Sequence, residues 1–355
     1  MLNARVFRDG RHEDRRLDVD ELAALSRDPD ACVWVCLPAG RTDDVRRLLP
    51  ALGVHRLAVE DVVTEHQRPK LERYADHLFL NAYAVRTAQG NGSGNRMPTL
   101  ALTEVSVVIR RNVLIVLAED DGFDADDVLS RADDNEELAG TGVWRLVHAL
   151  VDSLVDSQLA AAEQLDEAAD ALGDDLFAED DGSPRRSLQR NGFVLHKTIV
   201  ALRRVLLPMR EVTSTLLRHV HEDAAGGDGG DSTATAGRSR QDEKKAQKLA
   251  ELAAYLQDVN DHVLRAIDWT ESARDMSTTV LQTHLTIQGN TLNVVMKKVT
   301  SWAAIIAVPT LITGFYGMNV PYPGFNTVPG VVVACLLIVV CSGALWWQFR
   351  RRDWL

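Results

Sequence analysis

The sequence predicts an α+β domain followed by a long helix and two C-terminal membrane-spanning helices. Three observations support this fold class. The first 142 residues contain several short segments rich in Val, Leu, Ile and aromatic residues, which are typical of strands. The segment from Asp242 to Gly317 has no proline before Pro309 and little glycine, so it can form one continuous helix. The 51 residues from Val299 to Phe349 contain no Asp, Glu, Lys, Arg or His, which is far longer than an uncharged run in a soluble core.

Residues 1–142 form the predicted α/β domain, with a largely antiparallel sheet. Its strand-like segments are VWVCLP, HLFLNAYAV, EVSVVIR and NVLIVLAE. The segment TDDVRRLLPAL is typical of a helix with a polar N-terminal cap. The glycine-rich segment AQGNGSGNRMP separates two of the strands, and we expect it to form a hairpin loop.

Residues 143–221 are predicted to form a helical hairpin. Apolar residues recur at three- to four-residue spacing from Trp144 to Val155, and a second helix is expected from Pro184 to His219. Residues 222–241 are dominated by Gly, Ala, Asp, Ser and Thr, so we expect a flexible linker.

Residues 242–318 are predicted to form a stalk helix that continues into the first membrane helix, at about residues 299–318. At 1.5 Å per residue such a helix is about 110 Å long. A helix of this length cannot be enclosed in the core of a monomer. We therefore expect it to bundle with copies of itself.

The second membrane helix is expected at residues 328–349, after an uncharged outer loop at 319–327 that contains Pro321, Pro323 and Gly324. Lys297 and Lys298 precede the first membrane helix, and the tail at residues 350–355 begins with three arginines. Basic residues are retained on the cytoplasmic side. We therefore expect a multi-pass protein of the cell membrane with both termini in the cytoplasm.

The charge distribution excludes several classes of function. A net charge of −12 disfavours nucleic acid as a partner, because its binding needs a basic surface. Residues 119–181 contain 21 acidic residues and only two arginines. The acidic residues form either solvated helix faces or a field that attracts cations.

Catalytic motifs are missing from the sequence, which contains no HExxH, no nucleophile elbow, no phosphate loop and no CxxC. We therefore do not expect an enzyme.

The strongest motif is Gly317-Met318-Asn319, which follows Tyr316 at the outer end of the first membrane helix. Three further segments accompany it: Glu60-Asp61 with HQRPK at 66–70, YLQDV followed by Asp261-His262 at 255–262, and NVVMK at 293–297. Together these motifs resemble the CorA family of Mg²⁺ channels. The resemblance implies a funnel-shaped homopentamer in the lipid bilayer, with Gly317, Met318 and Asn319 as the selectivity filter and the first membrane helix lining the pore.

One face of that helix supports a pore independently. Mg²⁺ gives up its waters reluctantly, so a channel for it needs neutral oxygens, such as the Asn319 carbonyls, that contact the hydrated ion. Below the filter, steps of three to four residues give a row of small, polar and apolar side chains: Gly314, Thr310, Ala307, Ala303, Val299, Met296, Asn293 and Gly289. Met296 and Val299 would form an apolar constriction. The alternatives are a small-residue packing face for the row and a helix C-cap for Asn319.

The resemblance also implies regulation by Mg²⁺ held between cytoplasmic domains. The matching carboxylates are Glu60, Asp61 and Asp258. We expect Asp258 of one subunit and Glu60 and Asp61 of its neighbour to share the ion that keeps the channel shut. The alternative is that these carboxylates form ordinary surface salt bridges with Lys or Arg.

Two departures from the family pattern concern cation capture. The outer loop has no carboxylate, and Gln282 occupies a stalk position where the family often has an acidic residue. Co²⁺ and Ni²⁺ remain possible cargo, because they also travel as hydrated octahedral ions. A Zn²⁺ carrier of the same fold is another alternative, although Met318 favours Mg²⁺ and no Cys or His lies in the pore row. A non-conducting, membrane-anchored sensor or scaffold is the alternative from a different class.

Overall fold

The computed structural model of the chain describes residues 2–8, 11–28, 30–37, 42–64, 67–89, 97–138, 140–177, 184–225, 240–319, 321, 323–325 and 327–355. The chain divides into two compact units, Met1–Val280 and Leu281–Leu355. The hairpin loop predicted at 88–98 and the linker predicted at 222–241 lie largely outside the described residues.

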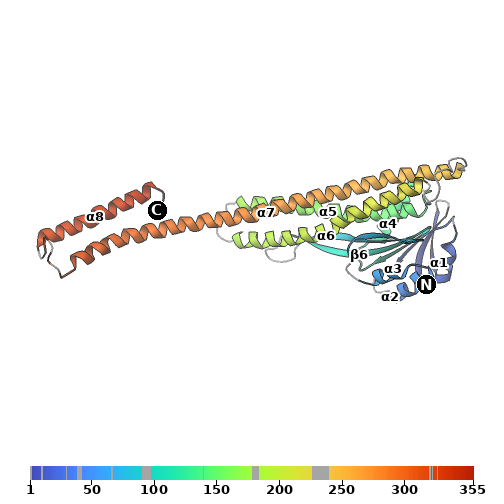
Figure 1. Ribbon diagram of the computed structural model, residues 1–355, viewed down its shortest axis with the longest axis horizontal. Coiled ribbons are helices and arrows are strands. Elements are labelled where there is room, and N and C mark those ends of the chain that lie inside the picture. Colours follow the sequence, from blue (N-terminus) through green and yellow to red (C-terminus); the bar gives the residue numbers. More distant parts are fainter. Residues whose placement is uncertain are drawn as a thin grey trace. The chain divides into compact units, whose positions relative to one another are not determined.

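A seven-stranded sheet forms the centre of the first unit, and part of it is visible around β6 in Figure 1. The strand order is β2-β1-β3-β7-β6-β5-β4. The strands are β1 (Leu2–Arg8), β2 (Arg11–Leu17), β3 (Cys32–Leu37), β4 (Lys70–Arg73), β5 (Leu78–Gln89), β6 (Pro98–Arg110) and β7 (Val113–Ala118). All neighbouring strands are antiparallel except β3 and β7, where Val33 pairs with Val113 in a parallel register. The predicted largely antiparallel sheet is therefore correct.

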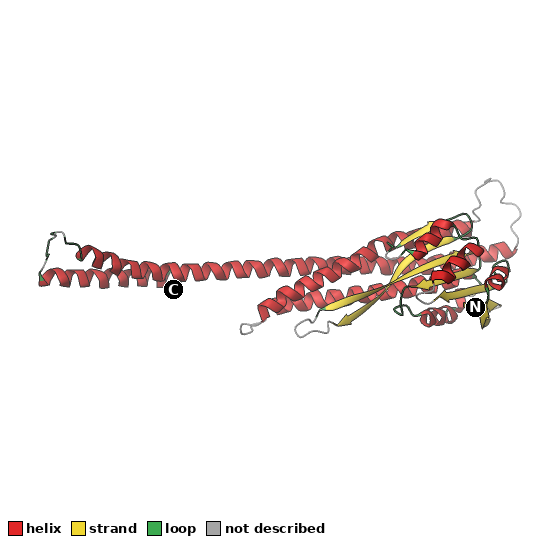
Figure 2. Cartoon of the chain, turned by 90° about the horizontal axis from the view of Figure 1, so that it is seen from below, coloured by secondary structure: helices red, strands yellow, loops and turns green. Residues whose placement is uncertain are grey.

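Helices cover both faces of this sheet (Figure 2). One face packs against α1 (Val19–Leu25), α2 (Thr42–Ala51) and α3 (Arg56–Val63), and the other against α4 (Ala125–Asp134), α5 (Val143–Phe177), α6 (Pro184–Ala225) and the first part of α7 (Arg240–Tyr316). Strand β3 shows the alternation that produces two cores. Val33 and Val35 face α1–α3, whereas Trp34 faces the opposite layer, because successive strand side chains point to opposite sides. A short 3₁₀ turn, η1 (Glu136–Leu138), joins α4 to α5.

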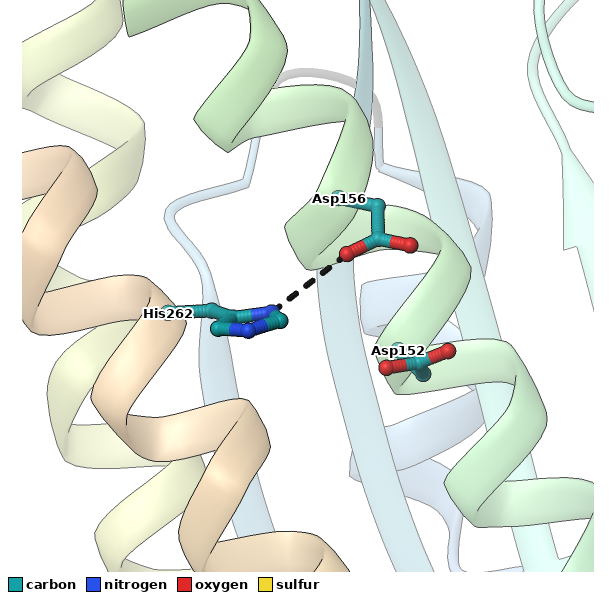
Figure 3. A group of neighbouring side chains, drawn as sticks. All are labelled: Asp152, Asp156 and His262. Carbon is teal, nitrogen blue, oxygen red and sulfur yellow. Dashed lines mark ion pairs between the residues drawn. The ribbon is translucent and has the colours of Figure 1, made fainter.

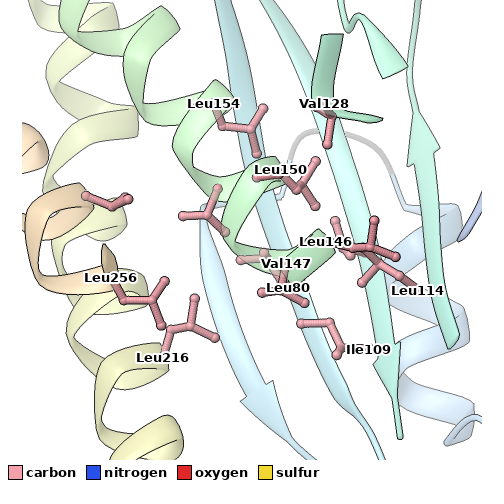
Figure 4. Packing of buried hydrophobic residues seen from close by; sticks show 14 of the residues in the cluster. Leu80, Ile109, Leu114, Val128, Leu146, Val147, Leu150, Leu154, Leu216 and Leu256 are labelled. Atoms are coloured by element: carbon pink, nitrogen blue, oxygen red, sulfur yellow. The ribbon is translucent and has the colours of Figure 1, made fainter. Parts of the chain in front are cut away.

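The larger core lies between the sheet and helices α4–α7 (Figure 4). Leu150 of α5 is fully buried there with Leu80 of β5 and Leu114 of β7. Leu216 of α6 and Leu256 of α7 close the other side of α5. Full burial of one such leucine stabilises the fold by about 1.5–3 kcal/mol. Burial of Leu256 therefore determines which face of α7 packs against this core.

A second part of the same unit is a three-helix arrangement of α5, α6 and α7. Leu165 of α5, Leu202 of α6 and Ala273 of α7 are fully buried in one cluster. Helix α6 continues to Ala225, past the predicted end of the hairpin at residue 221. Its Pro208 lies inside the helix, so proline did not end the helix here.

The second unit contains the end of α7 and α8 (Val328–Arg351). Helices α7 and α8 each contain a stretch long and apolar enough to cross a membrane, and only 6% of each stretch is buried. That exposure distinguishes them from core helices of a soluble protein. At the end of α8, the guanidinium of Arg350 lies 5.1 Å from the ring centre of Trp346, and that of Arg351 lies 5.4 Å from Trp347. Such tryptophan–arginine pairs suit a membrane–water boundary.

Candidate functional site

The predicted pore row occupies an exposed face of α7. Met296 is 63% exposed and Val299 is 60% exposed in the single chain, and all the other members of the row are exposed as well. Ile305, Val308 and Ile312, predicted for the opposite face, are instead half-buried. Large apolar residues of the same helix, such as Ile306 and Leu311, are exposed as well, so the role of the row in a pore stays a prediction.

Helix α7 ends at Tyr316, directly before the Gly-Met-Asn motif. The amide of Gly317 donates to the carbonyl of Thr313 at 2.9 Å, and the amide of Met318 donates to Phe315 at 3.2 Å. Among the glycines that the structure describes, Gly53, Gly142 and Gly324 have positive φ, and Gly317 does not. A Cβ at Gly317 would lie 3.1 Å from the carbonyl oxygen of Thr313. Glycine is therefore suited to this helix end by space rather than by a left-handed turn.

Asn319 follows in a bend and is exposed, as are Gly317 and Met318. No residue in the described part of the chain forms a hydrogen bond with the Asn319 side chain. Among the described non-glycine residues, Arg111 and Asp353 have positive φ and Asn319 does not, so Asn319 does not cap α7 in the left-handed conformation.

The carboxylates of Glu60 and Asp61 lie on α3. This short helix begins at His55, whose Nδ1 accepts a hydrogen bond from the amide of Leu57 at 3.3 Å. Glu60 is exposed. Oδ2 of Asp61 lies 2.6 Å from Nζ of Lys70 at the start of β4. The salt-bridge alternative therefore holds for Asp61 within the single chain.

Asp258 lies on α7 with 72% of its side chain exposed, and its Oδ2 is 3.8 Å from Nε2 of His262. Its neighbours Leu256 and Val259 belong to the core on the α5–α7 face of the sheet, whereas α3 packs on the other face. The structure therefore does not bring Asp258 together with Glu60 or Asp61 in one chain. An ion bound by all three must lie between two chains.

A cluster not predicted from the sequence lies between α5 and α7. Asp152, Asp156 and His262 offer ligand atoms within 4.8 Å of one another (Figure 3). Nη1 of Arg131 lies 3.1 Å from Asp152 and 2.6 Å from Asp156, and its Nε lies 2.9 Å from Asp127. The guanidinium already supplies the positive charge that a metal would bring. The four-residue spacings of Asp127 to Arg131 and of Asp152 to Asp156 were the available sequence signals.

Burial shifts the pKa of one member of this cluster, Asp152, and of a neighbouring residue, His148. Burial and the nearby Asp156 raise the pKa of Asp152. Burial lowers the pKa of His148, one turn earlier on α5, and the carboxylates of Asp152 and Asp258 only partly oppose that shift. Both directions follow from the cost of burying the charged form, so His148 is held neutral at physiological pH.

The chain matches a known protein family over most of its length. Residues 29–351 match the family described as "CorA-like Mg2+ transporter protein". The chain belongs to the CorA family. The "Cobalt/magnesium transport protein CorA" of Thermotoga maritima is 27% identical over 351 residues, covering 97% of this chain and 89% of that protein. The "Zinc transport protein ZntB" of Yersinia pseudotuberculosis is 23% identical over 298 residues, covering 82% and 78%.

Solved structures show the same fold as this CorA-family chain. The CorA magnesium transporter from Methanocaldococcus jannaschii superimposes with a TM-score of 0.69 at 20% identity, over 100% of this chain and 99% of that one. Full-length CmaX gives a TM-score of 0.65 at 21% identity, over 99% and 97% of the two chains. The predicted fold class, with an N-terminal α+β domain, a long helix and two apolar C-terminal helices, is therefore confirmed.

Proposed function

We propose that this chain is one subunit of a homopentameric membrane channel that admits Mg²⁺ to the cytoplasm, with both termini on the cytoplasmic side. The observation that carries the proposal is the combination of CorA-family membership over residues 29–351 with an exposed Gly-Met-Asn motif at the end of α7. Co²⁺ and Ni²⁺ are secondary cargo in this proposal.

The exposed row of α7 supports the pore. Five copies of this face around an axis would place the amide oxygens of Asn319 at the mouth and those of Asn293 at the inner end. Neutral oxygens contact the hydrated ion without removing its waters. Met296 and Val299 would form rings between these ends, narrow and apolar enough to block conduction by dewetting.

The membrane potential supplies the driving force for uptake. A divalent cation gains about 4–5 kcal/mol per 100 mV of inside-negative potential. Flow therefore has to be limited, and we assign that task to Mg²⁺ bound between subunits by Glu60 and Asp61 of one chain and Asp258 of the next. The positions of α3 and Asp258 on opposite faces of the sheet support a shared, inter-subunit site. Losing the ion would leave repelling carboxylates and bias the assembly towards opening.

The test is Mg²⁺ influx into liposomes that contain the purified full-length protein, with wild type compared to Asn319→Ala. The filter proposal predicts influx at least about tenfold slower in the variant. Asn3→Ala, at an exposed position of β1, is the matched control and keeps wild-type influx. Equal influx through wild type and Asn319→Ala would contradict the filter. Absence of wild-type influx of Mg²⁺, Co²⁺ and Ni²⁺ would favour Zn²⁺ transport or a non-conducting sensor.

A further inference from the structure

Lys70 is held between two carboxylates at the edge of the sheet. Its Nζ lies 2.6 Å from Oδ2 of Asp61 on α3 and 3.0 Å from Oε1 of Glu72 on β4. The side chains of Lys70 and Asp61 are only 26% and 24% exposed. This ammonium therefore forms an ion pair with Asp61, one of the carboxylates assigned above to the regulatory Mg²⁺.

The position of this ammonium is fixed by its surroundings. Lys70 pairs with Asn81 in the β4–β5 ladder, and its Nζ lies 5.6 Å from the ring centre of Phe79. Glu72 in turn accepts a hydrogen bond from the hydroxyl of Tyr74 at 2.8 Å. The lysine and its second carboxylate are thus both anchored in β4 and its neighbours, whereas Asp61 belongs to a separate helix.

We propose that Lys70 is a tethered competitor of the regulatory cation and sets the Mg²⁺ concentration at which the channel closes. This inference rests on the proposed role of Asp61. A divalent cation and an ammonium cannot both take the same carboxylate oxygen, and a positive charge within about 4–6 Å weakens cation binding even when it moves aside. Lys70 pairs with the Asp61 carboxylate when Mg²⁺ is absent. Mg²⁺ must displace the ammonium, so a higher Mg²⁺ concentration is needed to occupy the site.

Glu72 gives this arrangement a second position for the ammonium. When the Asp61 oxygen turns to a cation, Nζ of Lys70 retains its partner on Glu72. Neutralising Glu72 would leave the ammonium with Asp61 alone, so Mg²⁺ would bind less readily. Removing the lysine charge and removing the Glu72 charge therefore have opposite effects on Mg²⁺ affinity. A purely structural role for the pair would weaken Mg²⁺ binding in both cases.

The experiment measures the Mg²⁺ concentration that gives half of the maximal rise in melting temperature of the detergent-purified full-length protein. This readout does not require conduction. Lys70→Met is expected to lower that concentration by about two- to fivefold, as for loss of one partly exposed ion pair. Lys70→Gln is the second variant should Lys70→Met fold poorly. Lys70→Arg keeps the charge and is expected to need a higher Mg²⁺ concentration than Lys70→Met, and Glu72→Gln is expected to raise the concentration above the wild-type value.

A double variant with Asp61→Asn distinguishes the role of Lys70 from the existence of the regulatory site. In an Asp61→Asn background, Lys70→Met is expected to have a smaller effect than in the wild-type background, because the shared carboxylate is gone and only the nearby charge remains. If Asp61→Asn weakens the Mg²⁺ response while Lys70→Met and Lys70→Gln match wild type, the competitor role is overturned and the regulatory site stands. If Asp61→Asn has no effect, the regulatory site of the proposed function fails, and the role of Lys70 fails with it.

Discussion

Nη1 of Arg131 on α4 lies 2.6 Å from Oδ2 of Asp156 on α5. The same guanidinium also contacts Asp127 of its own helix and Asp152 of α5. One guanidinium thus pairs with three carboxylates and joins α4 to the helix that carries the main core. These groups are only partly exposed, so water does not fully replace the guanidinium when it is removed.

Arg131→Met is therefore expected to lower the free energy of unfolding of the first unit by about 1–3 kcal/mol, because it leaves neighbouring carboxylates without their cation. The measurement is the melting temperature of the purified full-length protein. Arg218→Met, which removes an exposed arginine whose Nη2 donates to Thr215, is the matched control and should leave it unchanged. Equal melting temperatures for wild type and Arg131→Met would contradict a stabilising role for this contact.

The buried His148 makes stability depend on pH. Only 8% of this residue is exposed, and burial lowers the pKa of its imidazole below the ordinary value of about 6.5. The unfolded chain therefore binds the proton more readily, and stability is lost as the pH falls from about 6.5 through the folded pKa. We expect the melting temperature to fall between about pH 6.5 and pH 5, and His148→Gln to remove part of that fall. The same pH slope in wild type and variant would assign the effect to other groups.

The apolar constriction proposed at Met296 and Val299 predicts a leak when one of its rings becomes polar. Val299→Asn is expected to raise Mg²⁺ influx at inhibiting internal Mg²⁺ by about tenfold or more, because a wetted constriction no longer blocks ions. Val294→Asn is the control, since five residues turn an α-helix to nearly its opposite side. The measurement is influx into liposomes loaded with Mg²⁺. A leak of similar size in both variants would indicate general disruption of α7.

Asp258 provides the test of inter-subunit regulation. Asp258→Asn is expected to raise the internal Mg²⁺ concentration for half-inhibition of influx by about tenfold, because Mg²⁺ is held by carboxylate oxygens and one of them is lost. Asp268→Asn, at an exposed position of the same helix, is the control and should keep the wild-type Mg²⁺ concentration for half-inhibition. Unchanged inhibition in Asp258→Asn would remove this residue from the site.

The sequence predicted the elements whose signal is local. Strands β3, β5, β6 and β7 correspond to the apolar segments identified beforehand, and α7 extends from Arg240 to Tyr316 as the scarcity of proline and glycine indicated. The β1–β2 hairpin was missed, because β2 reads RHEDRRL and has no apolar alternation. As an edge strand it is exposed along most of its length, so its pairing depends on β1 rather than on its own composition.

The sequence by itself determined the two apolar helices, because they follow from the long uncharged run from Val299 to Phe349. It also carried the resemblance to the family, through the Gly-Met-Asn motif and the segments that accompany it. Only the tertiary structure placed Asp258 and Asp61 on opposite faces of one sheet, set Lys70 against Asp61, and gathered three carboxylates around Arg131. These contacts join separate helices and strands. They depend on which faces pack together in the core, and the local periodicity of the chain does not encode that choice.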